Sequence, residues 1–308
     1  MTTGLLAGIL WGLDTVILGV ALAMSEFVST EQAILLAPFV STFLHDAFSS
    51  IWMLIYMGIK KQYKNVLYAL KTRSGKFIIL GALLGGPIGM SGYVAAINYI
   101  GPAYTAIISS LFPALGALLS YIFLKEKMTI VQMLGLFVSI VGVIVLGYTP
   151  GASEVSNLLL GFGCAILCCV GWAAEAVICA YGLKDPDITD EHALQIRQLT
   201  SALFYGVVIM TVLGGWNFTF DILPSTATMI IALSALFGTA SYVFYYRAIA
   251  TIGATKAMAL NITYSAWSIV FAFLLLHTLP DLKSIICGLV IVLGSLVAAA
   301  DIKEFIKK

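Results

Sequence analysis

Two tryptophan–carboxylate pairs interrupt an otherwise apolar sequence, each with the spacing Trp-x-x-acid. Trp172 precedes Glu175, and Trp11 precedes Asp14, so each indole shares a helix face with its acid. A carboxylate deep in a spanning helix is costly and normally faces a cavity or a partner. An acid beside an aromatic ring face suits an organic cation. The structural alternative for each acid is an ion pair or a hydrogen bond between helices.

A stripe of tyrosines could supply further ring faces. Tyr242, Tyr245 and Tyr246 follow the i, i+3, i+4 spacing of one helix face. Such stripes are more often packing, but each buried hydroxyl needs a partner, and acids nearby favour a binding role. A quaternary ammonium gains about 2 kcal/mol or more from each good desolvated ring contact. The other candidates for this wall are Tyr93, Asn261 and Tyr264.

Three more charged or titratable side chains lie inside apolar runs: Arg197, His45 and Asp46. Because arginine keeps its charge, Arg197 must pair with an acid or reach towards water. Pairing would give it a structural or coupling role, whereas a free guanidinium would bind an anionic substrate group. His45 beside Asp46 is either a proton relay or a satisfied structural pair.

Motifs of several enzyme classes are absent from the sequence. No GxxxxGK[ST], HExxH or GxSxG pattern occurs, which leaves no case for ATP hydrolysis, zinc proteolysis or an α/β-hydrolase site. The histidines are scattered, and the five cysteines lie in apolar runs without CxxC spacing. We therefore expect no metal, no cofactor and no enzymatic activity, and any transport should be secondary or facilitated.

The composition indicates which elements position these side chains. Hydrophobic residues make up 61% of the 308 residues and charged residues 10%, with a mean hydropathy of +1.03. Lipid is therefore the solvent for most of the chain, and the net charge of +1 offers no basic excess for nucleic acid. Because hydrocarbon satisfies no backbone group, each long apolar run predicts a spanning helix. Ten runs qualify, at about 3–24, 31–59, 75–99, 102–124, 129–148, 157–182, 191–213, 225–250, 253–276 and 282–301.

Basic residues predict the orientation of these helices. With the N-terminus inside, all 16 Lys and Arg residues except Lys283 and Arg197 fall in inside segments. An odd number of spans would remove this asymmetry. We therefore expect a multi-pass protein of the cytoplasmic membrane with both termini in the cytoplasm.

The two halves of the chain resemble each other, which predicts a repeat at 1–150 and a second at 151–308. An offset of about 152 matches Gly101 with Gly253, Tyr93 with Tyr245 and Gly142 with Gly294. Five helices in each half is an odd number, so the second repeat must run with inverted topology. Inverted repeats are typical of transporters that bind substrate between the two halves.

Longer stretches carry a family resemblance. The length, the two halves and the segment Leu124–Lys127 after the fourth span are similar to the drug/metabolite transporter superfamily, in its EamA-like ten-helix branch. More narrowly, the chain resembles the LicB-type choline permeases. The stretches concerned are Gly85–Met90, Trp172–Glu175, Ile196–Ser201, Ser241–Tyr246 and Leu260–Trp267.

The resemblance implies choline uptake across the cytoplasmic membrane, driven by the proton gradient. It assigns substrate binding to Trp11, Trp172, Glu175, Tyr242 and Tyr245, and a structural or coupling role to Arg197. Asp14 departs from the pattern of choline permeases, and a second negative charge would alter proton coupling or favour another cation.

We therefore predict an all-α membrane protein of ten helices in two inverted repeats, which imports choline or a similar quaternary amine by alternating access. The candidate substrate-binding residues are Trp11, Asp14, Tyr93, Trp172, Glu175, Tyr242, Tyr245, Asn261 and Tyr264. Glu175, Asp14 and Arg197 are the candidates for charge coupling. Protons and the lipid bilayer are expected partners, and the oligomeric state stays open. The alternatives are an exporter of amino acids or amphiphilic metabolites and, in another class, an intramembrane enzyme or a receptor subunit.

Overall fold

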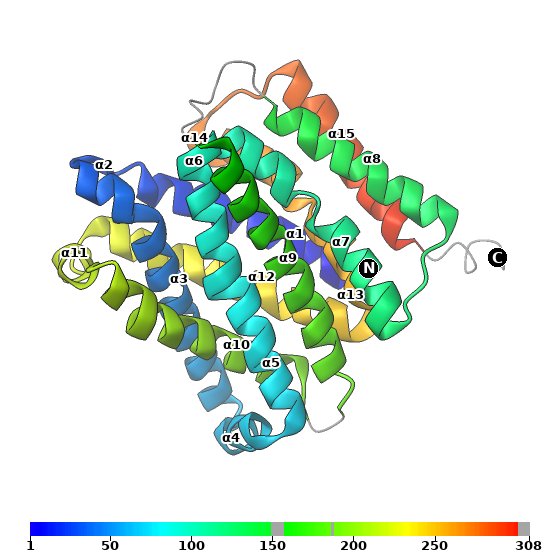
Figure 1. The fold of residues 1–308 in the computed structure, drawn as a ribbon, viewed down its shortest axis with the longest axis horizontal. Coiled ribbons are helices and arrows are strands. Elements are labelled where there is room, and N and C mark those ends of the chain that lie inside the picture. The colour runs from blue at the N-terminus through cyan, green and yellow to red at the C-terminus, as the bar shows by residue number, and fades with distance from the viewer. Residues whose placement is uncertain (149–156, 186–187, 301–308) are drawn as a thin grey trace.

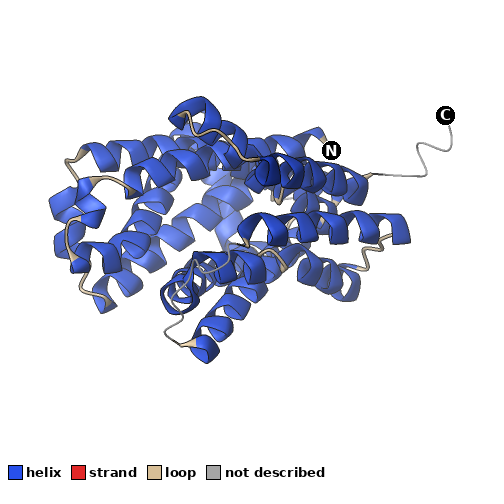
Figure 2. Ribbon diagram, turned by 90° about the horizontal axis from the view of Figure 1, so that it is seen from above, coloured by secondary structure: helices blue, strands red, loops and turns tan. Residues whose placement is uncertain are grey.

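The computed structural model describes residues 1–148, 157–185 and 188–300. These residues form helices joined by short connections, with no strand among them (Figure 2). Ten described segments are long and apolar enough to cross a membrane. They confirm the ten predicted spans, with differences of a few residues at their ends. The predicted boundary between the repeats, at 150/151, lies outside the described residues.

The spans are built from α-helices and three π-helical segments. In chain order the elements are α1 (Thr2–Leu22), α2 (Ser25–Val28), α3 (Glu31–Ile59), α4 (Tyr63–Lys71), α5 (Arg73–Leu83), η1 (Leu84–Met90), α6 (Ser91–Ser109), α7 (Phe112–Leu119), η2 (Ser120–Leu124), α8 (Ile130–Gly147), α9 (Leu158–Gly182), α10 (Asp190–Phe204), η3 (Tyr205–Met210), α11 (Trp216–Ile222), α12 (Thr226–Ile252), α13 (Ala254–Asn261), α14 (Tyr264–Leu276) and α15 (Leu282–Ala299). The short helices α2, α4 and α11 were not predicted, because apolar length was the signal used for the spans.

Side-chain caps fix where several spans begin. The side chains of Thr30, Thr189, Ser225 and Asp281 each accept a hydrogen bond from a backbone N–H in the first turn of their helix. At α8, Thr129 and Gln132 form a reciprocal capping box. Such caps satisfy backbone N–H donors that have no partner within the helix, so each capping residue determines where its helix begins.

The third to fifth spans of the two repeats keep one register, with equivalent residues 152 apart. Gly101 and Gly253 both have a positive φ, of 77° and 88°, with ψ of 165° and 160°. Lys125 and His277 are both left-handed, with φ of 62° and 54°. A glycine is needed at the first pair, because an L side chain strongly disfavours that extended positive-φ conformation. The sequence offset therefore corresponds to a repeat of backbone geometry.

Spans four and nine are also interrupted at equivalent points. Helix α6 ends at Ser109 and α7 begins at Phe112, while α13 ends at Asn261 and α14 begins at Tyr264. The two interruptions are again 152 residues apart. Discontinuous spans of this kind form the substrate sites of many secondary transporters.

The fifth span of each repeat packs against its counterpart. Helices α8 and α15 lie side by side at the upper right of Figure 1. Ser139 Oγ donates to the carbonyl oxygen of Ile291 over 2.6 Å, and these residues are equivalent in the repeat. A contact between equivalent residues places the pseudo-twofold axis between the two helices. Gly135 and Gly294 permit the close approach, since a Cβ on either would lie within 2.8 Å of the other's carbonyl oxygen.

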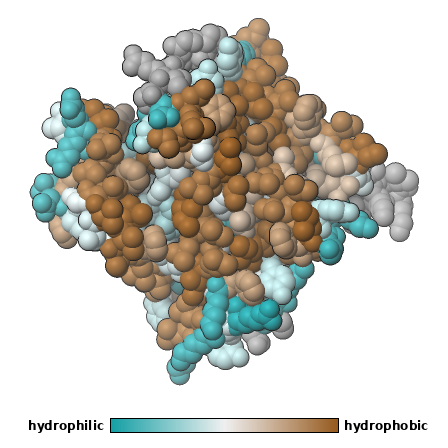
Figure 3. All heavy atoms as spheres, viewed as in Figure 1, coloured by the Kyte–Doolittle hydropathy of each residue, from teal (hydrophilic) through white to brown (hydrophobic). Residues whose placement is uncertain are grey.

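In the other main contacts, the first helix of each repeat packs against helices of the other repeat. Helix α1 packs along α12, and its counterpart α9 packs along α5, η1 and α6. Apolar side chains cover most of the face shown in Figure 3, and hydrophilic ones gather towards its edges. Leu159, Val212 and Leu289 are among the large apolar side chains that are exposed in the structure, and a surface rich in such side chains is suited to contact with lipid. The structure is therefore that of a multi-pass membrane protein with two inverted repeats.

Candidate functional site

A small cavity lies where both repeats meet. Its lining residues are Trp11, Phe112, Trp172, Glu175, Ala176, Tyr242, Tyr245 and Asn261. They come from α1, α7, α9, α12 and α13, so both repeats contribute to the walls. The volume is about 20 Å³, enough for about one water molecule. The aromatic walls therefore nearly touch in this conformation.

Each indole is flanked by two other rings, and one ring of each pair, Phe112 or Tyr264, is equivalent in the repeat. The ring centroids of Tyr93 and Phe112 lie 5.4 Å and 5.7 Å from that of Trp172. Across the cavity, the centroids of Tyr242 and Tyr264 lie 5.6 Å and 5.4 Å from that of Trp11. These are ordinary distances for favourable aromatic pairs. Tyr93 and Tyr264 therefore contact the indoles but are not among the residues that line the cavity.

Phe112 is a wall residue that the sequence analysis missed. It precedes Tyr264 by the repeat offset of 152, and each lies at the start of the second helix of an interrupted span. Applying the offset to Tyr264 would have found it. Phe112 has no acid at the Trp-x-x-acid spacing and no hydroxyl, the two features that single out the other rings in the sequence.

The carboxylate of Glu175 is buried and paired on one side. Its Oε1 accepts hydrogen bonds from Arg197 Nε over 2.8 Å and from the Tyr246 hydroxyl over 3.4 Å. Among the described residues, none donates a hydrogen bond to Oε2. This second oxygen packs against Gly85, where a Cβ would lie 1.7 Å from it. Glycine is thus required in η1 for the carboxylate to lie where it does.

Arg197 lies between the acid and the tyrosine stripe. Its guanidinium carbon is 4.6 Å from the ring centroid of Tyr242, whose hydroxyl accepts a hydrogen bond from Arg197 Nη2 over 3.1 Å. Arg197 Nη1 donates to Gln198 Oε1 over 2.8 Å and lies 3.5 Å from Asp46 Oδ1. The side chain is 3% exposed. Arginine therefore already holds the kind of cation–π and ion-pair contacts that an organic cation would make.

The charged residues continue away from the cavity as a connected chain. Asp46 Oδ1 lies 3.8 Å from His45 Nδ1, and His45 Nε2 lies 3.0 Å from Asp14 Oδ1. Asp14 also accepts a short hydrogen bond from Ser234, and Asp46 accepts one from Ser201 over 2.5 Å. Asp14 therefore lies at the far end of the chain from Glu175 and does not line the cavity.

The charges in this chain do not balance. Counted as formal charges, the three carboxylates of Glu175, Asp46 and Asp14 exceed the positive charges of one arginine and one histidine by at least one. A buried charge without a counter-charge is strongly destabilising. The arrangement therefore favours the binding of one further cation or proton. No cluster of three His, Cys, Asp or Glu side chains suited to a metal occurs in the described part of the chain.

Comparison with known proteins identifies the family. The model of the EamA-like transporter family matches residues 1–148 and 159–300. The chain belongs to this family. The EamA-like chain is 35% identical over 274 residues to Protein LicB of Haemophilus influenzae strain Rd, covering 88% of this chain and 87% of that protein. It is 25% identical over 253 residues to the Uncharacterized transporter YyaM of Bacillus subtilis, covering 80% and 78%.

The fold recurs in a solved structure titled "Crystal structure of protein". It covers 96% of each chain with a TM-score of 0.71 at 18% identity, which supports the fold alone. Family membership and the ten spans make the protein an EamA-like transporter, not an enzyme.

Proposed function

We propose that the protein imports choline or a similar quaternary amine, and that the cavity between the repeats is its binding site. One observation carries the proposal: Trp11, Trp172, Tyr242, Tyr245 and Phe112 surround a cavity that also contains one carboxylate. A quaternary ammonium has no N–H to donate, so ring faces and a nearby negative charge are the groups that select it.

The excess negative charge of the connected chain supports a cationic cargo. A quaternary amine bound beside Glu175 would neutralise that charge without a proton. Arg197 would then share Glu175 or shift towards Asp46, which it already approaches to 3.5 Å. Arg197 thus holds the cation position beside Glu175 until cargo binds there. The guanidinium and the quaternary amine would both use the Tyr242 ring.

Asn261 narrows the choice among quaternary amines. Its Oδ1 is buried, lines the cavity region and has no hydrogen-bond partner among the described residues. An unpaired buried acceptor costs about 1–3 kcal/mol. The hydroxyl of choline would supply the missing donor. The resemblance to LicB-type choline permeases and the 35% identity to Protein LicB support the same cargo.

The repeats suggest how the cargo crosses. Both halves contribute walls, and the cavity of about 20 Å³ is too small for any quaternary amine. The structure therefore corresponds to a closed state, and loading requires the halves to separate on one side. Rocking of two inverted repeats about a central site provides alternating access.

Protons enter the proposal through the same carboxylates. A cluster with one excess negative charge takes up either a cation or a proton, so protonation of Glu175 or Asp14 would be linked to cargo binding. The distribution of basic residues supports an orientation with the α4 end of the bundle in the cytoplasm. In this proposed orientation both termini also lie in the cytoplasm, and the membrane is the cytoplasmic membrane.

Export of amino acids is disfavoured by the position of Arg197. A zwitterionic cargo needs a cation for its carboxylate, but Arg197 is engaged by Glu175 and approaches Asp46.

The proposal is tested by thermal unfolding of the purified protein with choline, betaine, carnitine and amino acids, since a ligand stabilises the state that binds it.

Uptake by proteoliposomes provides the second part of the test. We expect choline to raise the unfolding temperature selectively, and Glu175→Gln to reduce choline uptake and alter its pH dependence. Normal uptake by Glu175→Gln at every pH, or stabilisation by amino acids in place of choline, would refute the proposed site.

A further inference from the structure

A second cluster of charged and aromatic side chains lies at the end of the bundle that bears α4. Glu191, in the first turn of α10, accepts hydrogen bonds from Lys60 Nζ over 2.6 Å and 2.8 Å and from the Tyr56 hydroxyl over 2.8 Å. Arg247 of α12 lies 3.4 Å from Glu191 and 2.9 Å from Asp190. The cluster connects α3, α10 and α12. Helix α12 lines the central cavity, while α10 carries Arg197 and α3 carries Asp46 of the connected chain.

This cluster repeats the chemistry of the central site. At the centre, an arginine pairs with Glu175 and lies over the Tyr242 ring. Here Lys60 pairs with Glu191, and its Nζ lies 4.9 Å from the ring centroid of Tyr56. Each place therefore combines a carboxylate, a tyrosine ring and a cation supplied by the chain itself.

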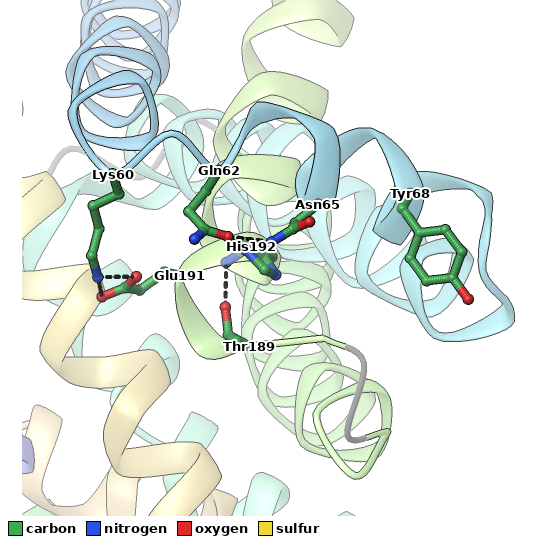
Figure 4. Close-up of a pocket in the computed structure, with 7 residues that line it drawn as sticks. All are labelled: Lys60, Gln62, Asn65, Tyr68, Thr189, Glu191 and His192. Carbon is green, nitrogen blue, oxygen red and sulfur yellow. Dashed lines mark hydrogen bonds and ion pairs between the residues drawn. The ribbon is translucent and has the colours of Figure 1, made fainter.

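A cavity of about 550 Å³ adjoins Glu191. Figure 4 shows Lys60 pointing to Glu191 at one side of it and His192, Gln62 and Asn65 at another. His192 is 6% exposed, and its Nδ1 has no hydrogen-bond partner among the described residues. The cavity thus has room for a small organic cation and retains an unpaired buried polar atom, which points to a missing ligand or water.

One face of α10 links this cavity with the central site. Glu191, Gln195 and Gln198 follow the i, i+4, i+7 spacing of a single helix face. Gln195 is 1% exposed, and neither atom of its amide has a partner among the described residues. Gln198 accepts from Arg197 over 2.8 Å. Polar side chains inside a membrane protein mark substrate pathways, and this row spans about 10 Å of helix.

We propose that Glu191 and Tyr56 form a second binding site for an organic cation, at the mouth of the exit path along α10, and that Lys60 fills this site when cargo is absent. The inference rests on the proposed cationic cargo but concerns residues outside the central cavity. In the proposed orientation, cargo released from Glu175 passes the amides of α10 and displaces Lys60 before entering the cytoplasm.

Lys60 is held loosely enough to be displaced. Its side chain is 41% exposed and that of Arg247 is 45% exposed, and an ion pair in contact with water contributes only about 0.2–1 kcal/mol. The hydrogen bonds with Glu191 raise the pKa of Lys60 above its ordinary value. Displacement would lower that pKa and increase the fraction of neutral, reactive amine.

The test is acylation of Lys60 in the purified full-length protein, quantified by mass spectrometry after a short pulse of an amine-reactive ester. The probe is tetramethylammonium chloride, compared with sodium chloride at the same concentration. We expect tetramethylammonium to increase the labelling of Lys60 by up to about fivefold. Labelling of the exposed Lys71 should stay unchanged. An equal effect of sodium chloride would be ionic screening and would overturn the proposal, as would no effect of tetramethylammonium.

Two variants separate the sites. In Glu191→Gln, Lys60 should label rapidly from the start and show no further response to tetramethylammonium. In Trp172→Ala, which removes a wall of the central site, the response of Lys60 should persist. Loss of the response in Trp172→Ala would assign it to the central site and overturn a separate inner site. The proposed function is judged independently, by choline uptake.

Discussion

Arg197 Nε lies 2.8 Å from Glu175 Oε1 in the middle of the bundle, so the acid with the clearest sequence signal is paired with the arginine of the seventh span. The pair is buried, and a buried pair is strongly destabilised when one partner is removed alone. The same contact therefore determines the stability of the protein and the availability of Glu175 to cargo.

Arg197→Gln should lower the free energy of unfolding by about 3–5 kcal/mol, because Glu175 and Asp46 lose their shared counter-charge. Adding Glu175→Gln to this variant should recover part of the loss. The two single variants and the double variant, compared in one denaturation series, give the coupling energy. An Arg197→Gln protein as stable as the wild type would mean that the two acids are compensated elsewhere.

Gly85→Ala should abolish high-affinity cation binding, because its Cβ would lie 1.7 Å from Glu175 Oε2 and must displace the carboxylate. We expect choline affinity to fall by at least about tenfold, or 1.4 kcal/mol. Gly19→Ala is the matched control, since a Cβ there meets nothing within 4 Å. Isothermal titration of both variants with choline provides the comparison, and equal affinities would show that the position of Glu175 does not matter.

Trp172→Ala should weaken the binding of quaternary amines by about 2 kcal/mol, or roughly thirtyfold in Kd, through loss of one cation–π wall. Trp172→Phe should keep part of that energy because it keeps a ring. Trp216 packs against Phe43 and Phe220 away from the cavity, so Trp216→Ala controls for the loss of an indole. A Kd unchanged in Trp172→Ala would exclude the indole from the site.

The sequence predicted the ten spans, the repeat offset and most of the cavity wall. Contact with lipid requires long apolar runs, and the helical period determines which residues share a face, so both can be read from short stretches of sequence. It did not predict which charges pair. Whether His45 reaches Asp14, and whether Arg197 reaches Glu175 or Asp46, depends on the rotation of α3 and α10 relative to their neighbours. That rotation is a property of tertiary packing, and the spacing of residues along one helix does not contain it. Phe112 was recoverable from the offset alone.

Asn261→Ala should distinguish choline from its analogue without a hydroxyl, propyltrimethylammonium. The variant should lose about 1 kcal/mol, or roughly fivefold, of choline affinity, the ordinary contribution of one hydrogen bond. Its affinity for propyltrimethylammonium should be equal to or higher than that of the wild type, because an unpaired buried acceptor has been removed. Competition binding with both ligands measures the difference, and equal losses for the two would indicate a packing role for Asn261.

Asp14→Asn should change the pH dependence of uptake and weaken choline binding less than the loss of a cavity wall does. Asp14 does not line the cavity but contacts His45, which is linked through Asp46 to Arg197. Because the lost charge is linked to cargo binding only through these partners, the Kd should rise by less than the roughly thirtyfold expected for Trp172→Ala. The variant removes the excess negative charge of the chain, so uptake should lose much of its response to external pH.

Asp14→Glu is the control for that experiment, since it keeps a titratable acid at the same place. Its uptake should retain a pH response, shifted but not abolished. Initial uptake rates in proteoliposomes, measured across a series of external pH values at constant membrane potential, separate the two variants. If Asp14→Asn keeps the wild-type profile, the proton is carried at Glu175 alone, and the chain from Asp14 to Arg197 serves only to hold α1, α3 and α10 together.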